Sequence, residues 1–364
     1  DAAYEEAAAE PSADPADVTG DVWSVPAERG SEPGEDTEPN QQLTFRKAIT
    51  EALEQAMAAN PEVFLLGEDV ADSAGGGVFH TTEGLSAKFG EDRVRNTPIS
   101  EEAIIGASIG AAMVGMRPVP EIMFMDFIGV AWDQLANHAA KLRYMSGGRT
   151  LAPLTMRVFM VGGTPIGAQH SQSNEALLMH TPGLKVVYPS TPYDAKGLLL
   201  ACIEDEDPCV FIECTALMMR RGSVPTERYT IPLGSAATRR RGNDVTIISW
   251  GRMMGEVLKA ADELAGSEIS AEVIDMRSLA PLDMDTVLES VARTGRAAVV
   301  HEAVRTCGPG AEIAARIHDE LHGQLAGPVR RITSPDSSVP AAPQLVGAFY
   351  PNAAGIVDTI RSMK

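Results

Sequence analysis

The sequence predicts two α/β domains, each built on an open and mostly parallel sheet, with the second domain smaller than the first. From Leu43 onward, short apolar segments alternate with amphipathic helical segments, a pattern typical of parallel sheets covered by helices. A chain of 364 residues is long enough for two such domains. Polar and turn-forming residues interrupt the alternation at 229–244. We therefore expect the first domain at 43–228 and the second at 240–364.

The first domain should begin with a helix at 43–60, where good helix formers carry apolar residues at helical spacing. Short apolar runs predict its strands at 63–70, 116–124, 154–161, 184–190 and 209–214. Further helices are expected at 101–115, 127–145 and 194–207. In the second domain, strands are expected at 245–251, 269–278, 297–303 and 329–334, and helices at 255–266, 285–295 and 311–323.

The segment 1–42 has a different composition from the rest of the chain. It holds twelve acidic residues, one basic residue and five prolines, with few large apolar side chains. Such a segment buries too little apolar surface to offset its ordering entropy, so we expect a disordered acidic tail or linker. Trp23 and Val25 could form a short docking spot within it.

Charge and cysteine content exclude several classes of protein. The formal net charge of −20 argues against binding nucleic acid or an anionic membrane surface, both of which need Lys and Arg. No apolar run reaches the roughly 18 residues that a membrane-spanning helix needs. The four cysteines show no C-x-x-C spacing, so we expect buried free thiols in a cytoplasmic protein rather than a zinc site.

The stretch TPISEE at 97–102 delivers two carboxylates to the start of an apolar helix. One role is capping: Ser100 can accept from the first N–H groups, and acids in the first turn suit the helix dipole. The question is whether Glu101 or Glu102 does more. Small residues four apart in the same helix, at 106 and 110, favour close packing against another helix.

A second candidate is the Gly-rich stretch 162–183, which follows a predicted strand and presents His170 between Gln169 and Ser171. A polar triplet at the carboxyl end of a strand suits a ligand site in an open α/β sheet, although a solvated loop is the alternative. Phe124 and Phe127 stand at a strand-to-helix junction. Such rings usually pack in the core, but a ring at a sheet edge can stack on a planar ligand.

Other polar groups are expected to have structural roles. His80 follows a glycine-rich loop, and His301 with Glu302 ends a strand of the second domain, where capping or interface roles are expected. The run Arg239–Arg241 should be a solvated turn, or else receive an acidic partner.

Over residues 43–364 the chain resembles the beta subunits of thiamine-diphosphate-dependent 2-oxo acid dehydrogenases, including the pyruvate, branched-chain and acetoin types. The resemblance implies a transketolase-like pyrimidine-binding domain followed by a transketolase C-terminal-like domain. The matching strings, in the family's order, are LLGEDVA, TPISE, GMRPVPEIMFMDF, WDQLANHAAKLRYMSGG, GAQHSQS, HTPGLKVVYPSTPYDAKGLLLACIEDEDPCVF, VIDMRSLAPLD and TGRAAVVHEA.

The resemblance implies that Glu101 bonds N1′ of the cofactor's aminopyrimidine ring and that Phe127 packs against this ring. His170 matches the active-site histidine near the thiazolium, where it would bind the substrate carboxylate or move protons during acyl transfer. The remaining residues implied at the same cofactor site are Glu68, Ile99 and Met123.

The resemblance also implies metals and partners. Some relatives bind a structural K⁺, and the corresponding positions here are Ala152, Leu154, Thr155, Cys202, Asp205 and Asp207. Relatives often carry Asn where Asp207 stands. The G-D-G that holds Mg²⁺ and the diphosphate is absent from this sequence. An alpha subunit should supply it, in a two-alpha, two-beta assembly or from a fused alpha-like half upstream.

Three functions follow as alternatives. The first is decarboxylation of a 2-oxo acid and transfer of the acyl group to a lipoyl domain. The second keeps the cofactor but transfers a two-carbon fragment from a ketose to a carrier protein or an acyloin-type product. The third is a non-catalytic scaffold subunit, against which the presence of Glu101 and His170 argues.

Overall fold

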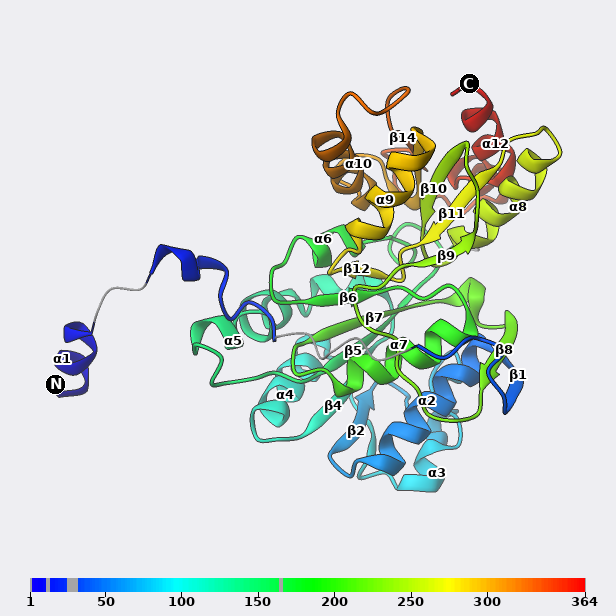
Figure 1. Cartoon of the computed structure of the whole chain (residues 1–364). Coiled ribbons are helices and arrows are strands. Elements are labelled where there is room, and N and C mark those ends of the chain that lie inside the picture. The colour runs from blue at the N-terminus through cyan, green and yellow to red at the C-terminus, as the bar shows by residue number, and fades with distance from the viewer. Residues whose placement is uncertain (1, 11–13, 25–31, 164–165, 364) are drawn as a thin grey trace.

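The computed structural model describes residues 2–10, 14–24, 32–163 and 166–363. It confirms two α/β units on mostly parallel sheets, one above the other in Figure 1. The larger sheet has the strand order β12-β6-β7-β5-β4-β2-β3, and the smaller has the order β14-β13-β10-β11-β9. In each sheet the antiparallel pairing involves an edge strand, β12 in the first and β9 in the second.

A short strand at 94–96 was not predicted, whereas the predicted segments contain the other five parallel strands of the first sheet. Its parallel strands are β2 (Val63–Gly67), β3 (Val94–Asn96), β4 (Arg117–Ile122), β5 (Thr155–Met160), β6 (Lys185–Val187) and β7 (Cys209–Cys214). The seventh strand, β12 (Ser278–Ala280), comes from the sequence of the second domain and pairs with β6. The two domains are therefore joined through a shared sheet edge as well as through the chain.

The helices around this sheet are α2 (Phe45–Ala59), α3 (Leu85–Phe89), α4 (Glu101–Met113), α5 (Leu142–Met145), α6 (Glu175–Met179) and α7 (Pro192–Glu204). The continuous helix predicted at 127–145 is wrong. A 3₁₀ turn at Met125–Gly129 and a π-helical segment at Gln134–Ala139 precede α5. Apolar periodicity does not reveal such changes of hydrogen-bonding pattern, because the same side chains face the core in each case.

The second sheet contains β9 (Ala237–Arg240), β10 (Val245–Ser249), β11 (Ala271–Asp275), β13 (Ala297–Val304) and β14 (Arg330–Ser334). Its helices are α8 (Met253–Ala265), α9 (Met284–Thr294), α10 (Pro309–Leu321), α11 (Pro343–Phe349) and α12 (Ala353–Arg361). A third, two-stranded sheet pairs β1 (Asn40–Thr44) with β8 (Arg221–Pro225). The sequence did not predict it, because both strands are short and mostly polar.

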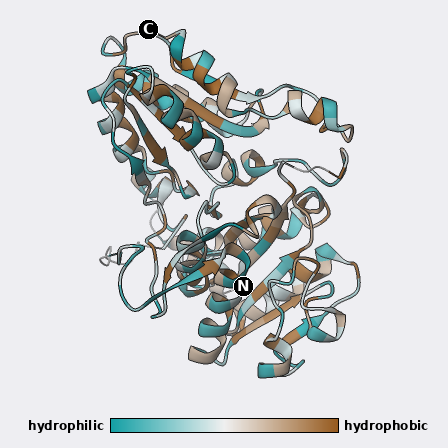
Figure 2. Cartoon of the chain, turned by 90° about the vertical axis from the view of Figure 1, so that its right-hand side faces the viewer, coloured by the Kyte–Doolittle hydropathy of each residue, from teal (hydrophilic) through white to brown (hydrophobic). Residues whose placement is uncertain are grey.

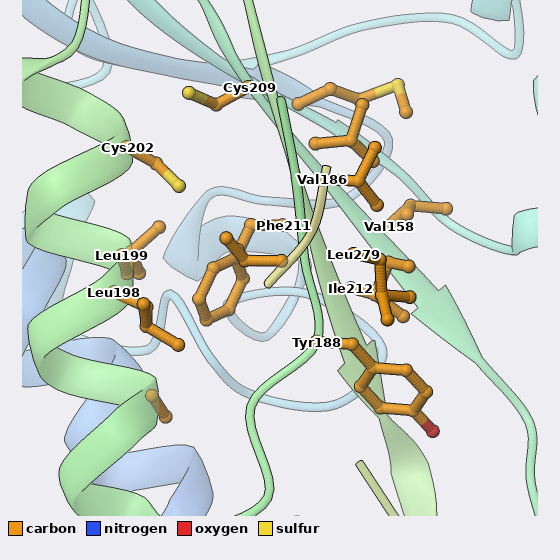
Figure 3. Close-up of a cluster of buried hydrophobic side chains, with 14 of the residues drawn as sticks. Val158, Val186, Tyr188, Leu198, Leu199, Cys202, Cys209, Phe211, Ile212 and Leu279 are labelled. Atoms are coloured by element: carbon orange, nitrogen blue, oxygen red, sulfur yellow. The ribbon is translucent and has the colours of Figure 1, made fainter. Parts of the chain in front are cut away.

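The cores lie between the sheets and their helices, where the apolar segments of Figure 2 are concentrated. Figure 3 shows Phe211 of β7 facing Leu198 and Leu199 of α7, all three fully buried. On the other side of the strands, Figure 3 shows Leu279 of β12 and Ile212 of β7, two strands that are separated by β6 in the sheet. No helix in the described ranges is long and apolar enough to cross a membrane.

The acidic segment is partly ordered where the structure describes it. It forms a short helix α1 (Ala2–Ala9) and a 3₁₀ turn at Pro15–Thr19, which project away from the two sheets in Figure 1. Residues 32–36 instead dock on the protein, since Glu32 pairs with Arg277 at 2.7 Å and Glu35 pairs with Arg239 at 2.5 Å. Residues 1, 11–13 and 25–31, including Val25, lie outside the described part.

Arg239 does not lie in a solvated turn. It is on β9 with only a small part of its side chain exposed, and it also pairs with the buried carboxylates of Asp194 and Asp275. The alternative expectation, an acidic partner, is met within the chain by Glu35. The isolated sequence could not show this, because the partners are 204 and 36 residues away.

Candidate functional site

The candidate residues follow the carboxyl ends of four adjacent parallel strands, ordered β5-β4-β2-β3 in the sheet. Glu68 comes directly after β2, and Glu101 follows β3. Met123 and Phe127 follow β4, and His170 lies in the loop after β5. Ligands of open α/β sheets bind outside this edge. The topology thus places at one edge of the sheet the residues that the sequence predicted for one site.

Glu101 is the first residue of α4 and is only 7% exposed, whereas Glu102 is exposed. The turn before it is attached to β2 by a hydrogen bond from the Thr97 N–H to the Gly67 carbonyl, 2.9 Å. The expected capping by the Ser100 side chain is wrong: this residue is the N-cap, but its hydroxyl accepts no capping hydrogen bond. Its carbonyl accepts from the Ile104 N–H instead. The turn therefore buries the carboxylate of Glu101 and leaves that of Glu102 exposed to solvent.

Glu68 lies close enough to Glu101 for their charges to interact. Burial raises the pKa of the Glu68 carboxyl, and the charges of Glu101, Asp69 and Glu121 raise it further. Like charges gathered at a sheet edge disfavour full ionisation of the group. The pKa of the Glu68 carboxyl is therefore raised both by burial and by its acidic neighbours at this edge.

An aromatic cluster borders the His170 imidazole. The ring centroids of Phe127 and His170 lie 5.3 Å apart at an interplanar angle of 80°, and those of Phe124 and His170 lie 5.2 Å apart at the same angle. Phe124 and Phe127 also meet edge to face. The sequence left open whether these rings pack in the core or reach a ligand. They are half-buried and in contact with the histidine, so they form one wall of the candidate site.

The loop that carries His170 is tied to the turn that carries Phe127. Asp126 Oδ1 accepts from the Gln172 backbone N–H at 3.2 Å and from its side-chain amide at 2.8 Å. Within the loop, the Ile166 N–H donates to the Ser171 hydroxyl at 3.0 Å. These bonds hold the histidine and the aromatic wall in a fixed relation. Residues 164–165 of the same loop lie outside the described part.

The two remaining predicted contacts differ in their surroundings. Met123, which directly precedes Phe124 in the sequence, is half-buried, whereas the Ile99 side chain is 81% exposed. An apolar side chain with this exposure next to a buried carboxylate is a candidate for cover by a ligand or by another subunit.

Comparison with known proteins identifies both domains of the chain. The family model of the transketolase pyrimidine-binding domain matches residues 41–220, and that of the transketolase C-terminal domain matches 234–356. The acetoin:2,6-dichlorophenolindophenol oxidoreductase subunit beta of Cupriavidus necator is 46% identical over 327 residues, 88% of this chain and 96% of that protein. The pyruvate dehydrogenase E1 component subunit beta of Bacillus subtilis is 45% identical over 323 residues, 88% of this chain and 98% of that protein.

This chain belongs to the beta-subunit family of thiamine-diphosphate-dependent 2-oxo acid dehydrogenases. Among solved structures, a split-gene transketolase described as an inactive beta4 tetramer has a TM-score of 0.69 and 22% identity, over 88% of this chain and 98% of that one. Transketolase from Leishmania mexicana has a TM-score of 0.63 and 19% identity, over 90% of this chain and 47% of that one. Both likenesses concern the fold alone.

Beneath the site of this beta subunit lies a buried charge network that the sequence analysis missed. Arg157 of β5 donates to Glu121 of β4 at 2.8 Å and to Glu213 of β7 at 2.5 and 3.0 Å. Burial raises the pKa of Glu213 to about 7, against the lowering effect of the Arg157 charge. The available signal was the presence of Glu121, Arg157 and Glu213 within largely apolar strand segments. Such residues are almost never fully buried unless paired.

The positions implied for K⁺ lie together at the opposite ends of β5 and α7 from the candidate site. The Leu154 carbonyl accepts from the Cys209 N–H at 2.9 Å, and Asp207 donates its N–H to Asp205 Oδ1 at 2.9 Å. A side-chain cation is already present, because the Lys185 ammonium lies 2.7 Å from Asp205 and 3.0 Å from Asp207. The Asp205 carbonyl accepts from the Arg117 guanidinium at 2.9 Å. Oxygen atoms that would bind K⁺ are therefore already in contact with the side-chain cations of Lys185 and Arg117.

Proposed function

We propose that this beta subunit, together with an alpha subunit, decarboxylates a 2-oxo acid and passes the acyl group to a lipoyl domain. The observation that carries the proposal is the buried Glu101 carboxyl at the same sheet edge as the Phe127–His170 wall. A buried acid at the same sheet edge as an aromatic wall fits an aminopyrimidine, which offers a ring nitrogen for hydrogen bonding and a flat face for packing. Thiamine diphosphate, when bound, supplies the electron sink that decarboxylation needs.

Each chain residue then has a limited task. Glu101 holds a proton at the pyrimidine N1′ in a site from which water is largely excluded, where a carboxyl hydrogen bond is stronger than in solution. Phe127 and Met123 orient the ring, and Glu68 adds a second carboxyl group at the same sheet edge. His170, held by the Asp126–Gln172 bonds, binds the substrate carboxylate or moves a proton during acyl transfer.

The alpha subunit supplies the diphosphate and Mg²⁺ half of the site, because the G-D-G element is absent from this sequence. Exposed apolar side chains around α4 support a subunit interface there: Ile99, Met113 and Val114 are all more than half exposed. A Cβ atom at Gly110 would meet nothing within 4 Å, so the helix is open for close packing at this position, whereas at Gly106 it would lie 3.3 Å from the Gln134 amide oxygen. A two-alpha, two-beta assembly places one such helix at each site.

The K⁺ site and the cytoplasmic location stay predictions. The six residues implied for K⁺ offer backbone carbonyl oxygens as ligands, but Lys185 and Arg117 already supply positive charge there. The four cysteines are all free thiols, which suits the predicted cytoplasmic location.

The substrate is tested by turnover of the reconstituted alpha–beta pair with pyruvate, branched-chain 2-oxo acids, acetoin and ketose phosphates, with a lipoyl domain as acceptor. The proposal expects decarboxylation or cleavage that depends on both subunits, thiamine diphosphate and Mg²⁺. Tight Mg²⁺-dependent cofactor binding by this chain alone would contradict the divided site. A pair that assembles and binds cofactor without turning over any of these compounds would favour the scaffold role.

A further inference from the structure

The loop that carries His170 begins against an ion pair of the second domain. Arg252, just before α8, donates from Nε to Glu302 of β13 at 2.9 Å, and a second guanidinium nitrogen lies 2.8 Å from the same carboxylate. A Cβ atom placed on Gly162 would lie 2.7 Å from Glu302 Oε2 and 2.9 Å from Arg252 Nε. The start of the loop therefore rests directly on the pair, and a side chain at this position would have to displace the pair.

The far end of the same loop returns to the same pair. Glu175, the first residue of α6, is fully buried, and its carboxyl lies near the Trp250 indole and the charge of Glu302. Among the described residues, neither of its oxygens has a hydrogen-bond partner of good geometry. A cavity of about 580 Å³ separates the middle of the loop from the second domain, with Gln172 and Ser173 on one side and Glu302 and Val304 on the other.

The pair is itself rigidly held. The Tyr188 hydroxyl donates to Glu302 Oε1 at 2.9 Å, and the Arg252 guanidinium lies 4.9 Å from the centre of the Tyr350 ring. Both members are at least 85% buried as side chains. A buried pair of this kind has few alternative arrangements, because each partner would otherwise leave an unpaired charge.

We propose that the Arg252–Glu302 pair of the second domain positions the His170 loop, so that this domain contributes to the active site without touching the substrate. The inference rests on the proposed function for its effect on catalysis, although not for its effect on the loop. Asp126 holds the middle of the loop against the aromatic wall, and the pair lies directly against its first residues at Gly162. Loss of the pair should let the imidazole move away from Phe127.

The test uses the complex of the full chain with its alpha subunit and four variants. Glu302→Gln and Arg252→Met break the pair. Tyr188→Phe removes one hydroxyl donor and keeps the ring, while Gly162→Ala disturbs the contact from the loop side. The control is Arg293→Met, which breaks another partly buried pair of the second domain, with Glu272.

Two readouts are measured on each complex. Hydrogen exchange of peptides covering 166–174 should quicken on the order of tenfold in the pair-breaking variants and stay unchanged in the control. The kcat should fall on the order of 10- to 100-fold, with KM changed less than about threefold, since misplacement by 1 Å can cost that much in rate. The pH dependence of kcat should change as well, because the environment of the imidazole changes.

Wild-type loop exchange and an unaltered pH profile in Glu302→Gln would overturn the inference. If neither Glu302→Gln nor Arg252→Met folds, the decision rests on Tyr188→Phe and Gly162→Ala, where control-like exchange in both overturns it. A wild-type complex that turns over no 2-oxo acid contradicts the proposed function instead, and the exchange measurement still decides the role of the pair.

Discussion

The Phe127 ring meets the His170 imidazole edge to face, with centroids 5.3 Å apart, although the two residues belong to different loops. The contact joins the turn after β4 to the loop after β5, and the Asp126–Gln172 bonds fix the same two segments. An imidazole held by rings on one side and by backbone tethers on the other has little freedom to turn. Preorganisation of this kind lowers the cost of reaching a reactive geometry.

Substitution of Glu101 by Gln should abolish activation of the cofactor while leaving the fold intact. Glutamine has the same shape, but it cannot hold a proton in the way that the buried carboxyl does. We expect hydrogen–deuterium exchange at the thiazolium C2 to slow by 100-fold or more, in the range of general acid–base effects. Glu102→Gln is the matched control, because its side chain is exposed one residue away. Normal C2 exchange in Glu101→Gln would refute the role.

Substitution of Phe127 by Leu should weaken cofactor binding by about fivefold, because a ring contact contributes about 1 kcal/mol beyond its buried area. The measurement is a titration of the reconstituted complex with thiamine diphosphate. Phe159→Leu is the control, since Phe159 is buried in the core against Phe79 and should lower stability without changing affinity. Equal affinities for wild type and Phe127→Leu would remove Phe127 from the site.

The sequence predicted five parallel strands of the first sheet, because apolar runs leave a local pattern, whereas Glu68, Ile99 and Met123 were implied for the site only by the family resemblance. Apolar runs mark β2, β4, β5 and β7, and the residues that follow each run lie at the sheet edge by topology. What it could not predict depends on distant pairing. The strand β12 pairs with the first sheet although it belongs to the sequence of the second domain. Arg157 pairs with two carboxylates from neighbouring strands, and Arg252 pairs with Glu302, fifty residues later in the sequence. Such pairings depend on tertiary packing, and a short stretch of sequence does not reveal them.

Substitution of Arg157 by Met should lower the free energy of unfolding by about 3–5 kcal/mol, because it leaves Glu121 and Glu213 buried without their cation. Urea unfolding of the variant measures this, with Arg316→Met as the control. Arg316 forms an exposed pair within α10, where about 0.5 kcal/mol is expected. A loss of similar size in both variants would mean that the buried network contributes no more than a surface pair.

The buried Glu175 should make stability depend on pH. Burial raises its pKa to about 7 from an ordinary value of 4.5. Between these values the unfolded chain releases a proton that the folded chain keeps, so the contribution of this group to stability falls as pH rises through the window. Above pH 7 the full loss is about 3 kcal/mol.

Glu175→Gln should therefore be more stable than wild type at pH 8 by on the order of 2–3 kcal/mol, with a much smaller difference at pH 5. Urea unfolding at the two pH values measures both quantities. Glu312→Gln serves as the control, because its side chain is about half exposed on α10. A Glu175→Gln difference that is the same at both pH values would show that the carboxyl is not held neutral by burial.

The acidic segment should detach when its two docked glutamates lose their charge. Glu32 and Glu35 bind Arg277 and Arg239, but both guanidiniums also contact the buried Asp194. The double variant Glu32→Gln/Glu35→Gln should therefore keep its fold, losing about 1–2 kcal/mol at most, while proteinase K cuts the segment several-fold faster. High salt should produce part of the same effect in wild type. The control Glu5→Gln/Glu6→Gln makes an equal charge change on the exposed helix α1. Equal digestion rates for the two double variants would mean that the arginine contacts do not retain the segment.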